Sequence, residues 1–457
     1  MMNLSGRHAE NAFTRGSLWQ SIWRMSWPML LVMLLNFFVG LTDIYVAGFL
    51  GPQVQAVVGF VGQLYFFIII VANAISIGTV ALVSRAVGAG DHAEALKSAQ
   101  QSLLFGLISA IALAAAGFIF RDIILSPAGF SGEVRTIART FFALFTAALV
   151  PNYIVIIANA IFRAGGEVKL TLLAMAIISS MNIALNFLFV FGVASFPGIG
   201  YRGIALATAV SMIIGMIVCL LLFRKSIWKD IFSGIRIVSF DLITRIISIS
   251  WPAVLIQISW NAGNIFLYSV LGRLGETSIS GMAALTNGLR IEAVIYLPAF
   301  ALNMAASVLT GQNLGAGEIG RAEKIGWKIM FSGVFLVTLM SIPILFWPEV
   351  FSGLVSRDAL VLEETARYLR ITMLVEPFMA ISVILAGCLQ GAGDTKGAMA
   401  VIVAALWGIR LPLAFLLALT LGYGAVGVWI AMAVSMFFQS IGMTLRFRQG
   451  RWKRLNP

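Results

Sequence analysis

Twelve apolar runs, each long enough to cross a lipid bilayer as a helix, take up most of this sequence. They are separated by Gly, Pro or charged residues and lie at about 25–50, 55–84, 97–120, 136–162, 169–193, 203–223, 242–271, 281–310, 325–347, 362–390, 397–421 and 423–445. The composition agrees, with 60% hydrophobic residues, 11% charged residues and a mean hydropathy of +0.97. The sequence therefore predicts an all-α polytopic membrane protein of twelve transmembrane helices, because helices satisfy their own backbone inside lipid.

The basic residues indicate how the chain is oriented. Of the Lys and Arg residues, 21 fall in the amino-terminal segment, the tail and the loops on one side, against 8 on the other. The positive-inside rule then predicts that both termini are cytoplasmic, in a multi-pass protein of a plasma membrane of the bacterial inner-membrane type. The same loops account for the net charge of +12, so we expect contact with membrane lipid and no nucleic-acid partner. The first run is too long for a signal peptide and no small-residue cleavage pattern follows it, so we expect the amino terminus to be retained.

Short motifs recur in the same order in the two halves of the chain. The pairs are Ser26–Pro28 with Ser250–Pro252, Gly88–Asp91 with Gly315–Glu318, Ala164–Lys169 with Gly391–Lys396, and Ala209–Ser211 with Ala433–Ser435. Each pair is separated by 224 or 227 residues, which indicates a duplicated unit of six spans. Six is even, so the copies form a parallel repeat with a pseudo-twofold axis along the membrane normal. We expect an amino-terminal lobe at 1–223, a cytoplasmic linker at 224–241 with room for a short amphipathic helix, and a carboxy-terminal lobe at 242–457.

Pro28 and its equivalent Pro252 stand near the starts of spans 1 and 7. A proline in the first turn of a helix costs no hydrogen bond, which is one interpretation. The other is a hinge, if the helix already begins before Pro28 and the proline weakens its hydrogen-bond ladder.

Asp43 is the acid that most needs an explanation. No charge lies between Arg24 and Asp43, or between Asp43 and Arg85. An Asp at the centre of a membrane helix costs about 2.5 to 3.5 kcal/mol on insertion scales, so such an acid is a candidate functional residue. The alternative is that Asp43 meets the headgroups, but seven uncharged residues continue the run beyond it.

Span 5 supplies amide side chains that could act with Asp43. Asn182 and Asn186 are four residues apart and share one helix face. With Thr208 they could offer oxygen atoms to a cation, or they could only bond neighbouring helices. We assign Asp43, Asn182, Asn186 and Thr208 as cation-coupling candidates, with Na⁺ possible at the first three.

The other charges well inside the spans are few. Glu292 and Glu376 fall in the outer halves of spans 8 and 10, at about the depth of Asp43, which predicts an outward-opening cavity. Arg410 lies near the middle of span 11, so we expect it to pair with Glu292 or Glu376. The polar candidates for a substrate cavity are Glu292, Glu376, Arg290, Arg410, Gln257 and Asn261.

The sequence offers no pattern for enzymatic chemistry. Cys219 and Cys388 each stand in an apolar run, and no spacing suggests a disulfide or a metal site. A Walker loop, an HExxH motif and a Ser, His and carboxylate set are also absent. We therefore expect no enzyme and no cofactor, and any transport must draw on an ion gradient.

These motifs together resemble the multidrug and toxic compound extrusion (MATE) family of cation-coupled exporters. The resemblance rests on Thr42-Asp43 with Ala47-Gly48, on VGAGD and NLGAGE, on FRAGGEVK and LQGAGDTK, and on NIALNFLFVFG, and it covers nearly the whole chain. It implies two six-helix lobes, alternating access, and export of small organic, often cationic, compounds against H⁺ or Na⁺. Asp43 would match the cation-coupling acid of span 1.

The chain departs from the family pattern at three positions. Asn186 stands where many members have Asp, and Trp260 and Met379 stand where some have acids. Asn186 removes one charge from the proposed cation site, and Na⁺ needs several oxygen ligands whereas a proton needs one acid. We therefore expect H⁺ as the driving ion, with Na⁺ as the alternative.

We expect the protein to be a monomer. Two other functions remain open. A lipid-linked oligosaccharide flippase of the same superfamily should carry several Arg in its cavity for pyrophosphate, and this chain offers only Arg290 and Arg410. A membrane structural protein without transport would leave buried Asp43 unexplained.

Overall fold

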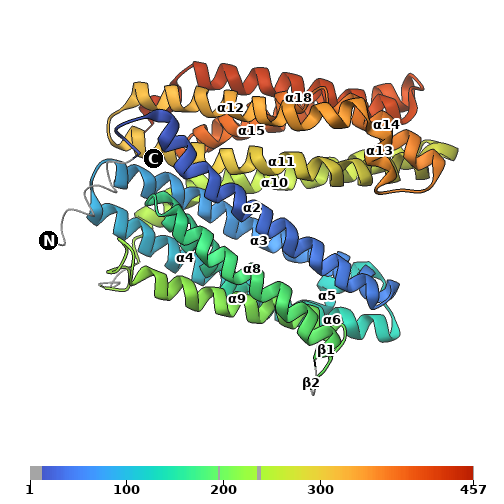
Figure 1. The fold of residues 1–457 in the computed structure, drawn as a ribbon, viewed down its shortest axis with the longest axis horizontal. Coiled ribbons are helices and arrows are strands. Elements are labelled where there is room, and N and C mark those ends of the chain that lie inside the picture. The colour runs from blue at the N-terminus through green and yellow to red at the C-terminus, as the bar shows by residue number, and fades with distance from the viewer. Residues whose placement is uncertain (1–12, 194–195, 234–237, 456–457) are drawn as a thin grey trace. The chain divides into compact units, whose positions relative to one another are not determined.

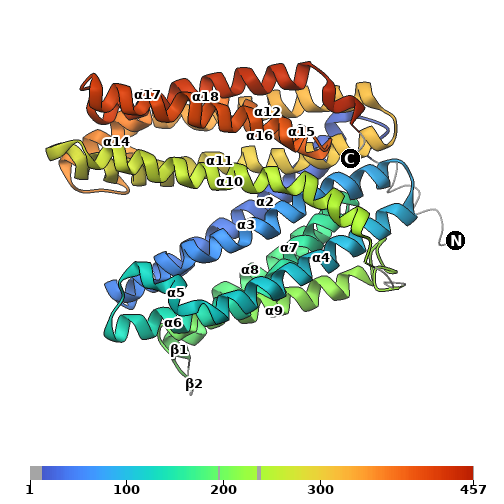
Figure 2. The ribbon, with the colours of Figure 1, turned by 180° about the vertical axis from the view of Figure 1, so that it is seen from behind.

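The structure, a computed structural model, describes residues 13–193, 196–233 and 238–455. Long α-helices make up most of these residues (Figures 1 and 2). Among the described residues, ten helices are long and apolar enough to span a membrane, and the count reaches twelve if each of two bent helix pairs is one span. The prediction of an all-α membrane protein with twelve spans is confirmed.

The described chain forms two compact units. Residues 13–15 and 27–250 make unit 1, and residues 16–26 and 251–455 make unit 2. The units therefore do not end where the predicted lobes end, because the described part of the linker and the start of the seventh span pack with unit 1.

Unit 1 contains the helices of the first six spans. They are α2 (Leu18–Phe49, of which residues 18–26 belong to unit 2), α3 (Pro52–Gly88), α4 (His92–Ile119), α5 (Arg121–Leu125), η1 (Ser126–Ala128), α6 (Gly132–Ala147), α7 (Leu149–Ala164), α8 (Val168–Phe191) and α9 (Arg202–Phe223). The two-residue strands β1 (Gly192–Val193) and β2 (Phe196–Pro197) form an antiparallel pair between α8 and α9. This hairpin of two-residue strands leaves the all-α fold class unchanged.

Unit 2 contains the remaining elements. They are α10 (Phe240–Gly272, whose start belongs to unit 1), η2 (Gly275–Thr277), α11 (Ser278–Gly315), α12 (Ile319–Phe346), α13 (Pro348–Gly353), α14 (Ala359–Thr372), α15 (Glu376–Gly391), α16 (Thr395–Ala405), the π-helical η3 (Leu406–Arg410), α17 (Leu411–Phe415), the π-helical η4 (Leu416–Thr420), α18 (Gly424–Arg448) and η5 (Arg451–Arg454).

The two bent spans occupy equivalent places in the repeat. Helices α6 and α7 meet at 43°, and α14 and α15 meet at 58°. The first break is at Ala148 and the second ends at Val375, a separation of 227 residues that matches the offset of the sequence motifs. The duplication is therefore visible in the positions of the helix breaks as well as in the sequence motifs.

Pro28 and Pro252 both lie inside helices. Helix α2 begins at Leu18 and α10 begins at Phe240, so neither proline is in a first turn, and that interpretation is wrong for both. In each helix the division between units falls just before the Trp-Pro pair, at 26/27 and at 250/251. Each proline removes a backbone donor there, so a hinge role stays a prediction for these sites.

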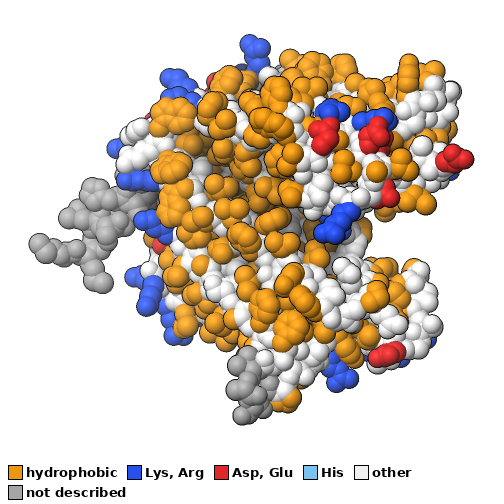
Figure 3. Space-filling model, turned by 45° about the vertical axis from the view of Figure 1, so that its right-hand side comes forward, with side chains coloured by type: hydrophobic (Ala, Val, Ile, Leu, Met, Phe, Trp, Pro, Cys, Tyr) orange, Lys and Arg blue, Asp and Glu red, His pale blue; other side chains and the backbone are white. Residues whose placement is uncertain are grey.

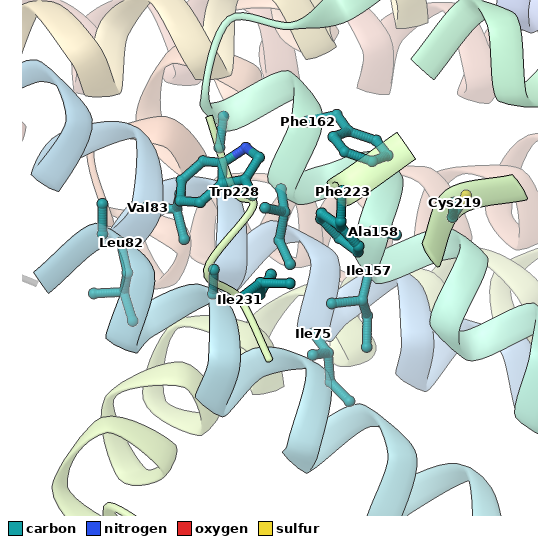
Figure 4. Packing of buried hydrophobic residues seen from close by; sticks show 14 of the residues in the cluster. Ile75, Leu82, Val83, Ile157, Ala158, Phe162, Cys219, Phe223, Trp228 and Ile231 are labelled. Atoms are coloured by element: carbon teal, nitrogen blue, oxygen red, sulfur yellow. The ribbon is translucent and has the colours of Figure 1, made fainter. Parts of the chain in front are cut away.

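The described part of the linker packs against unit 1 and forms no helix at residues 224–233. Its described residues 224–233 form turns, so the expected amphipathic helix is absent from them. Figure 4 shows Trp228 and Ile231 among the buried side chains of unit 1, with Phe162 and Phe223 nearby. The Gln100 amide also donates to the carbonyls of Ile231 at 2.9 Å and Ser233 at 2.8 Å. These contacts satisfy the backbone that a helix would otherwise have satisfied.

Two glycines let α15 approach α11 closely in unit 2. A Cβ atom on Gly387 would collide with the backbone oxygen of Asn303, and one on Gly391 would collide with that of Ser307. Small residues four apart allow membrane helices to pack backbone to backbone. This packing brings the two helices that carry Glu292 and Glu376 together.

The helix surfaces are hydrophobic along their length. On α12, Phe331, Phe335 and Leu339 are 64%, 71% and 55% exposed and follow each other every four residues, which is the pattern of a lipid-facing stripe. Figure 3 shows hydrophobic side chains covering much of one face of the molecule.

The turn between α7 and α8 generates a prediction about stability. Burial raises the pKa of the Glu167 carboxyl from 4.5 to about 7, while a hydrogen bond from the Ile227 backbone N–H lowers it in part. A carboxyl whose pKa is raised by folding lowers the stability of the folded protein as the pH rises from the pKa of that carboxyl in the unfolded chain to its pKa in the folded protein. We expect Glu167→Gln to melt at the wild-type temperature at pH 4.5, and above it at pH 8.

Asp394 provides the matched control, because it occupies the equivalent turn of unit 2. It accepts two 2.8 Å hydrogen bonds from Arg446 and caps α16 through the backbone N–H of Gly397. Asp394→Asn should lower the melting temperature at pH 8. A melting temperature of Glu167→Gln that stays below wild type at pH 8 would contradict the prediction.

Candidate functional site

The Asp43 side chain, on α2, is hydrogen-bonded to α8 inside unit 1. Asn186 Nδ2 donates to Asp43 Oδ1 at 2.8 Å and to Asn182 Oδ1 at 3.0 Å. Asn182 and Asn186 are 1% and 0% exposed and Asp43 is partly exposed, so the Asn186 amide bonds the acid to the buried face of α8. A carboxylate with a neutral donor can stay inside a bilayer span at lower cost than an unpaired one.

The same row of polar groups continues to α9. Asn182 Nδ2 donates to Thr208 Oγ1 at 3.4 Å, and Thr208 donates to the backbone oxygen of Ile204 at 3.3 Å. All four residues assigned to cation coupling therefore belong to one hydrogen-bonded row across three helices, which we call the Asp43 row. Asn186 Oδ1 is buried and has no hydrogen-bond partner.

The Asp43 row offers oxygen atoms but only one acid. Among the described residues, no group of three or more His, Cys, Asp or Glu side chains could hold a metal ion. A Na⁺ ion would have to use Asp43, the two amide oxygens and Thr208. In this structure the Asn186 N–H groups already occupy an oxygen of Asp43 and the oxygen of Asn182.

Unit 2 buries a second polar cluster. Glu292 on α11 and Glu376 on α15 are 1% and 3% exposed, and the two carboxyls interact electrostatically. The Tyr296 hydroxyl donates to Glu292 Oε2 at 2.7 Å, whereas Glu376 Oε2 has no hydrogen-bond partner. The hydroxyls of Tyr368 and Thr372 lie near Glu292 but also lack a partner with hydrogen-bond geometry.

Arg410 belongs to this cluster without a direct ion pair. Its Nε donates to Ser435 Oγ at 2.8 Å, and its guanidinium lies 4.8 Å from the centre of the Trp260 ring. No carboxylate of the described residues comes within ion-pair distance of it, so the predicted pairing with Glu292 or Glu376 is wrong as a direct contact. The interaction with Glu292 is electrostatic only.

The remaining cavity candidates are more accessible. Arg290 is exposed on α11, although Glu292 two residues later is buried. Gln257 and Asn261 are partly exposed on α10, and the Asn261 amide donates to the Gln257 backbone oxygen at 2.9 Å. Their assignment to a substrate cavity stays a prediction.

Sequence reasoning missed the hydroxyl groups around the two glutamates. The spacing contained a signal, because Tyr296 follows Glu292 by four residues, which places both on one helix face. Glu364, Tyr368, Thr372 and Glu376 likewise follow each other every four residues.

The chain is similar in sequence to known proteins over most of its length. The family model described as MatE matches residues 28–188 and 252–416, two stretches that begin at the equivalent prolines. The probable multidrug resistance protein NorM of Thermotoga maritima is 24% identical over 419 residues, which are 91% of this chain and 89% of that protein. The uncharacterized transporter YisQ of Bacillus subtilis is 24% identical over 423 residues, or 92% and 91% of the two chains.

Two solved structures show the same fold. One, described as the outward-facing conformation of a multidrug resistance MATE family transporter of the MOP superfamily, has a TM-score of 0.89 at 21% identity and covers 100% of both chains. The other, of a MOP superfamily transporter from Pyrococcus furiosus, has a TM-score of 0.86 at 22% identity and covers 96% of this chain and 97% of that one. Its description reports reverse polarity of the binding pocket, suggesting a different function.

The central position of Asn186 generates a prediction. Asn186→Leu keeps a side chain of similar size but removes the donor shared by Asp43 and Asn182. We expect a loss of about 1 to 2 kcal/mol, seen as a lower melting temperature in detergent. Ser179→Ala is the control, because Ser179 on the same helix is 1% exposed and its hydroxyl has no partner. Equal melting temperatures for the two variants would contradict a role for the Asn186 donor.

Proposed function

Because this chain belongs to the MatE family, we propose that it is a secondary active antiporter that exports small organic, mainly cationic, compounds while H⁺ enters. The observation that carries the proposal is the Asp43 row, where a single acid is partly buried and bonded to neutral partners inside unit 1. An acid held in this way can gain and lose a proton without leaving a buried charge unpaired.

The position of the Asn186 amide favours H⁺ over Na⁺. Its N–H groups point at the oxygen atoms of Asp43 and Asn182 that a sodium ion would need, and a hydrogen-bond donor repels a cation. Na⁺ binding would require this amide to turn over and present Oδ1, whereas protonation of Asp43 requires only the free lone pairs of one carboxyl. A hard cation also prefers more negative oxygen than one acid supplies.

Alternating access gives the Asp43 row its role in coupling. An ion can shift the equilibrium between two conformations only if it binds them with different affinities. The row joins α2, α8 and α9, so a change in the charge of Asp43 alters the bonds that hold these helices together. Protonation of Asp43 therefore changes hydrogen bonds on which the packing of unit 1 depends.

The family and the composition support the proposed substrate class and setting. Relatives are named as multidrug resistance proteins, and the 33 Phe and 19 Met of this chain suit an adaptable apolar cavity wall. We place the protein as a monomer in a bacterial-type inner membrane with both termini in the cytoplasm, without enzymatic activity or a bound cofactor. Pro28 is the proposed hinge of the first span.

An oligosaccharide flippase of the same superfamily is the second candidate. It would need several Arg side chains free to bind a pyrophosphate. Arg410 is 2% exposed and already bonded to Ser435, which leaves Arg290 as the exposed cation among the cavity candidates. The small number of available Arg side chains favours export of organic cations over a flippase function.

Transport by reconstituted protein tests the proposal. A drug-susceptibility panel in an efflux-deficient host first identifies a compound, which is then loaded into proteoliposomes. We expect an imposed proton gradient to drive exchange of that compound in the absence of Na⁺, and Asp43→Asn to abolish it because the amide cannot titrate.

Thr42→Val is the matched control, because the Thr42 hydroxyl bonds only within its own helix, to the backbone oxygen of Phe38. This variant should transport at about the wild-type rate. Transport that needs Na⁺ and ignores the pH gradient would overturn the choice of ion, and full transport by Asp43→Asn would overturn the coupling site.

A further inference from the structure

The start of α2 lies against the start of α12 in unit 2 (Figures 1 and 2). The Arg321 guanidinium, in the first turn of α12, donates to the Gly16 carbonyl at 2.9 Å and to the Ser21 hydroxyl at 3.4 Å. Ser21 and Met25 are 1% and 0% exposed, so this face of α2 is buried. The two helices therefore begin side by side at the same end of unit 2.

The opposite face of this stretch of α2 carries two exposed tryptophans. Trp19 and Trp23 are 56% and 69% exposed, and their spacing of four residues places them on one side of the helix. Tryptophan is enriched where a membrane meets water, because its ring is apolar and its indole N–H is polar. The pair therefore indicates that this end of unit 2 lies at a membrane–water interface.

Two lysines of α12 lie beside these tryptophans. Lys328 Nζ is 5.3 Å from the centre of the Trp19 ring, which is a cation–π contact. Lys324 is one turn closer to the start of the helix, about 6 Å along its axis, and is exposed. The two ammonium groups thus project from one side of α12, next to an aromatic ring of α2.

Neither lysine has a counterion in the described part of the chain. No carboxylate of the described residues lies within ion-pair distance of Lys324 or Lys328. The Glu323 carboxylate, next in sequence to Lys324, accepts from Lys453 at 2.8 Å instead. Two positive charges about one turn apart are therefore available to an anion from outside the protein.

The side of α12 that carries the lysines continues as the hydrophobic stripe of this helix. Phe331, Phe335 and Leu339 follow Lys328 at intervals of three or four residues, so they project in the same direction. The length from Lys328 to Leu339 is about 16 Å along the helix, or half of a hydrocarbon core of about 30 Å. This is the depth that one acyl chain of a phospholipid reaches.

We propose that this surface, made up of Trp19, Trp23, Lys324, Lys328 and the stripe from Phe331 to Leu339, binds one anionic glycerophospholipid. The two ammonium groups bind the phosphate, the tryptophans contact the glycerol region, and one acyl chain lies along the stripe. Because Trp19 belongs to α2 and both lysines belong to α12, one bound lipid connects the starts of the two helices. The inference goes beyond the proposed transport and does not depend on it.

An anionic lipid fits the surface better than a soluble anion or a zwitterionic lipid. A soluble phosphate uses the lysines but has no apolar part for the stripe. A zwitterionic headgroup brings its own cation, which competes with Lys324 and Lys328 for the phosphate. An anionic headgroup lacks this competitor, and its acyl chains match the exposed aromatic rings of α12.

Quenching of tryptophan fluorescence by lipids with brominated acyl chains tests the site in the full chain. The protein is reconstituted into phosphatidylcholine bilayers with increasing fractions of brominated phosphatidylglycerol or of brominated phosphatidylcholine. The measured quantity is the quenching of Trp19 and Trp23, taken as the difference between wild type and the variant Trp19→Phe with Trp23→Phe. We expect phosphatidylglycerol to give half of its full quenching at about a tenfold lower fraction than phosphatidylcholine, because two lysines attract its headgroup.

The double variant Lys324→Gln with Lys328→Gln should lose this preference for phosphatidylglycerol. The matched control is Lys225→Gln with Lys229→Gln, which removes the same charge from two exposed lysines four residues apart in the linker, and it should keep the preference. An equal fall in both double variants would show diffuse attraction to a basic surface and would overturn the site. Equal quenching by the two lipids in the wild-type protein would overturn it as well.

Glycerol phosphate distinguishes a lipid from a soluble anion. Added in excess at constant ionic strength, it should leave the quenching by brominated phosphatidylglycerol unchanged, because it offers nothing to the stripe of α12. Loss of that quenching would show that the lysines bind a free phosphate group, and the assignment to a lipid would then be wrong.

Discussion

The hydrogen bond from Asn186 to Asp43 is the interaction on which the functional account depends. A bilayer span offers no water to an acid, so Asp43 needs a donor from within the protein, and the Asn186 amide supplies it at 2.8 Å. The same amide donates to Asn182, which donates to Thr208, so hydrogen bonds connect the partly buried acid with three helices of unit 1. The charge of Asp43 and the packing of these helices are therefore linked, which is the physical requirement for an ion to drive a conformational change.

The two units solve the problem of buried charge in different ways. Unit 1 surrounds one acid with neutral amides, whereas unit 2 buries two acids together with a guanidinium and tyrosine hydroxyls. The turns after α7 and α15 differ as well, because Asp394 accepts from Arg446 whereas its equivalent Glu167 accepts from one backbone N–H. The duplicated backbone, with breaks at equivalent positions, thus carries two dissimilar polar sites. Helix α15 packs closely against α11 at Asn303 and Ser307 because Gly387 and Gly391 have no side chains there.

The sequence predicted the spans and the Asp43 row, because few polar residues occur within the spans and their depth follows from helical rise. Asn182 and Asn186 were recognisable as a shared face from their spacing of four. The direction in which Arg410 points was not predictable, since it lies in a π-helical segment whose extra residue per turn rotates the side chain away from its regular position. Ser435 and Trp260 then receive the guanidinium. The linker was also beyond prediction, because burial of Trp228 and Ile231 against distant helices outweighs local helix propensity.

Solid-state NMR of the protein in lipid bilayers tests the central claim most directly, with ¹³C-labelled Asp carboxyls and ¹⁵N-labelled Asn amides. The Asp43 signal is identified by its absence in Asp43→Asn, and the pH is cycled over the range in which the protein transports. The account predicts that the Asp43 carboxyl changes between its protonated and ionised shifts, and that the Asn186 amide signal moves with it because the two share a hydrogen bond. An Asp43 carboxyl that keeps one charge state throughout, or an Asn186 amide that responds to Na⁺ and not to pH, would contradict it.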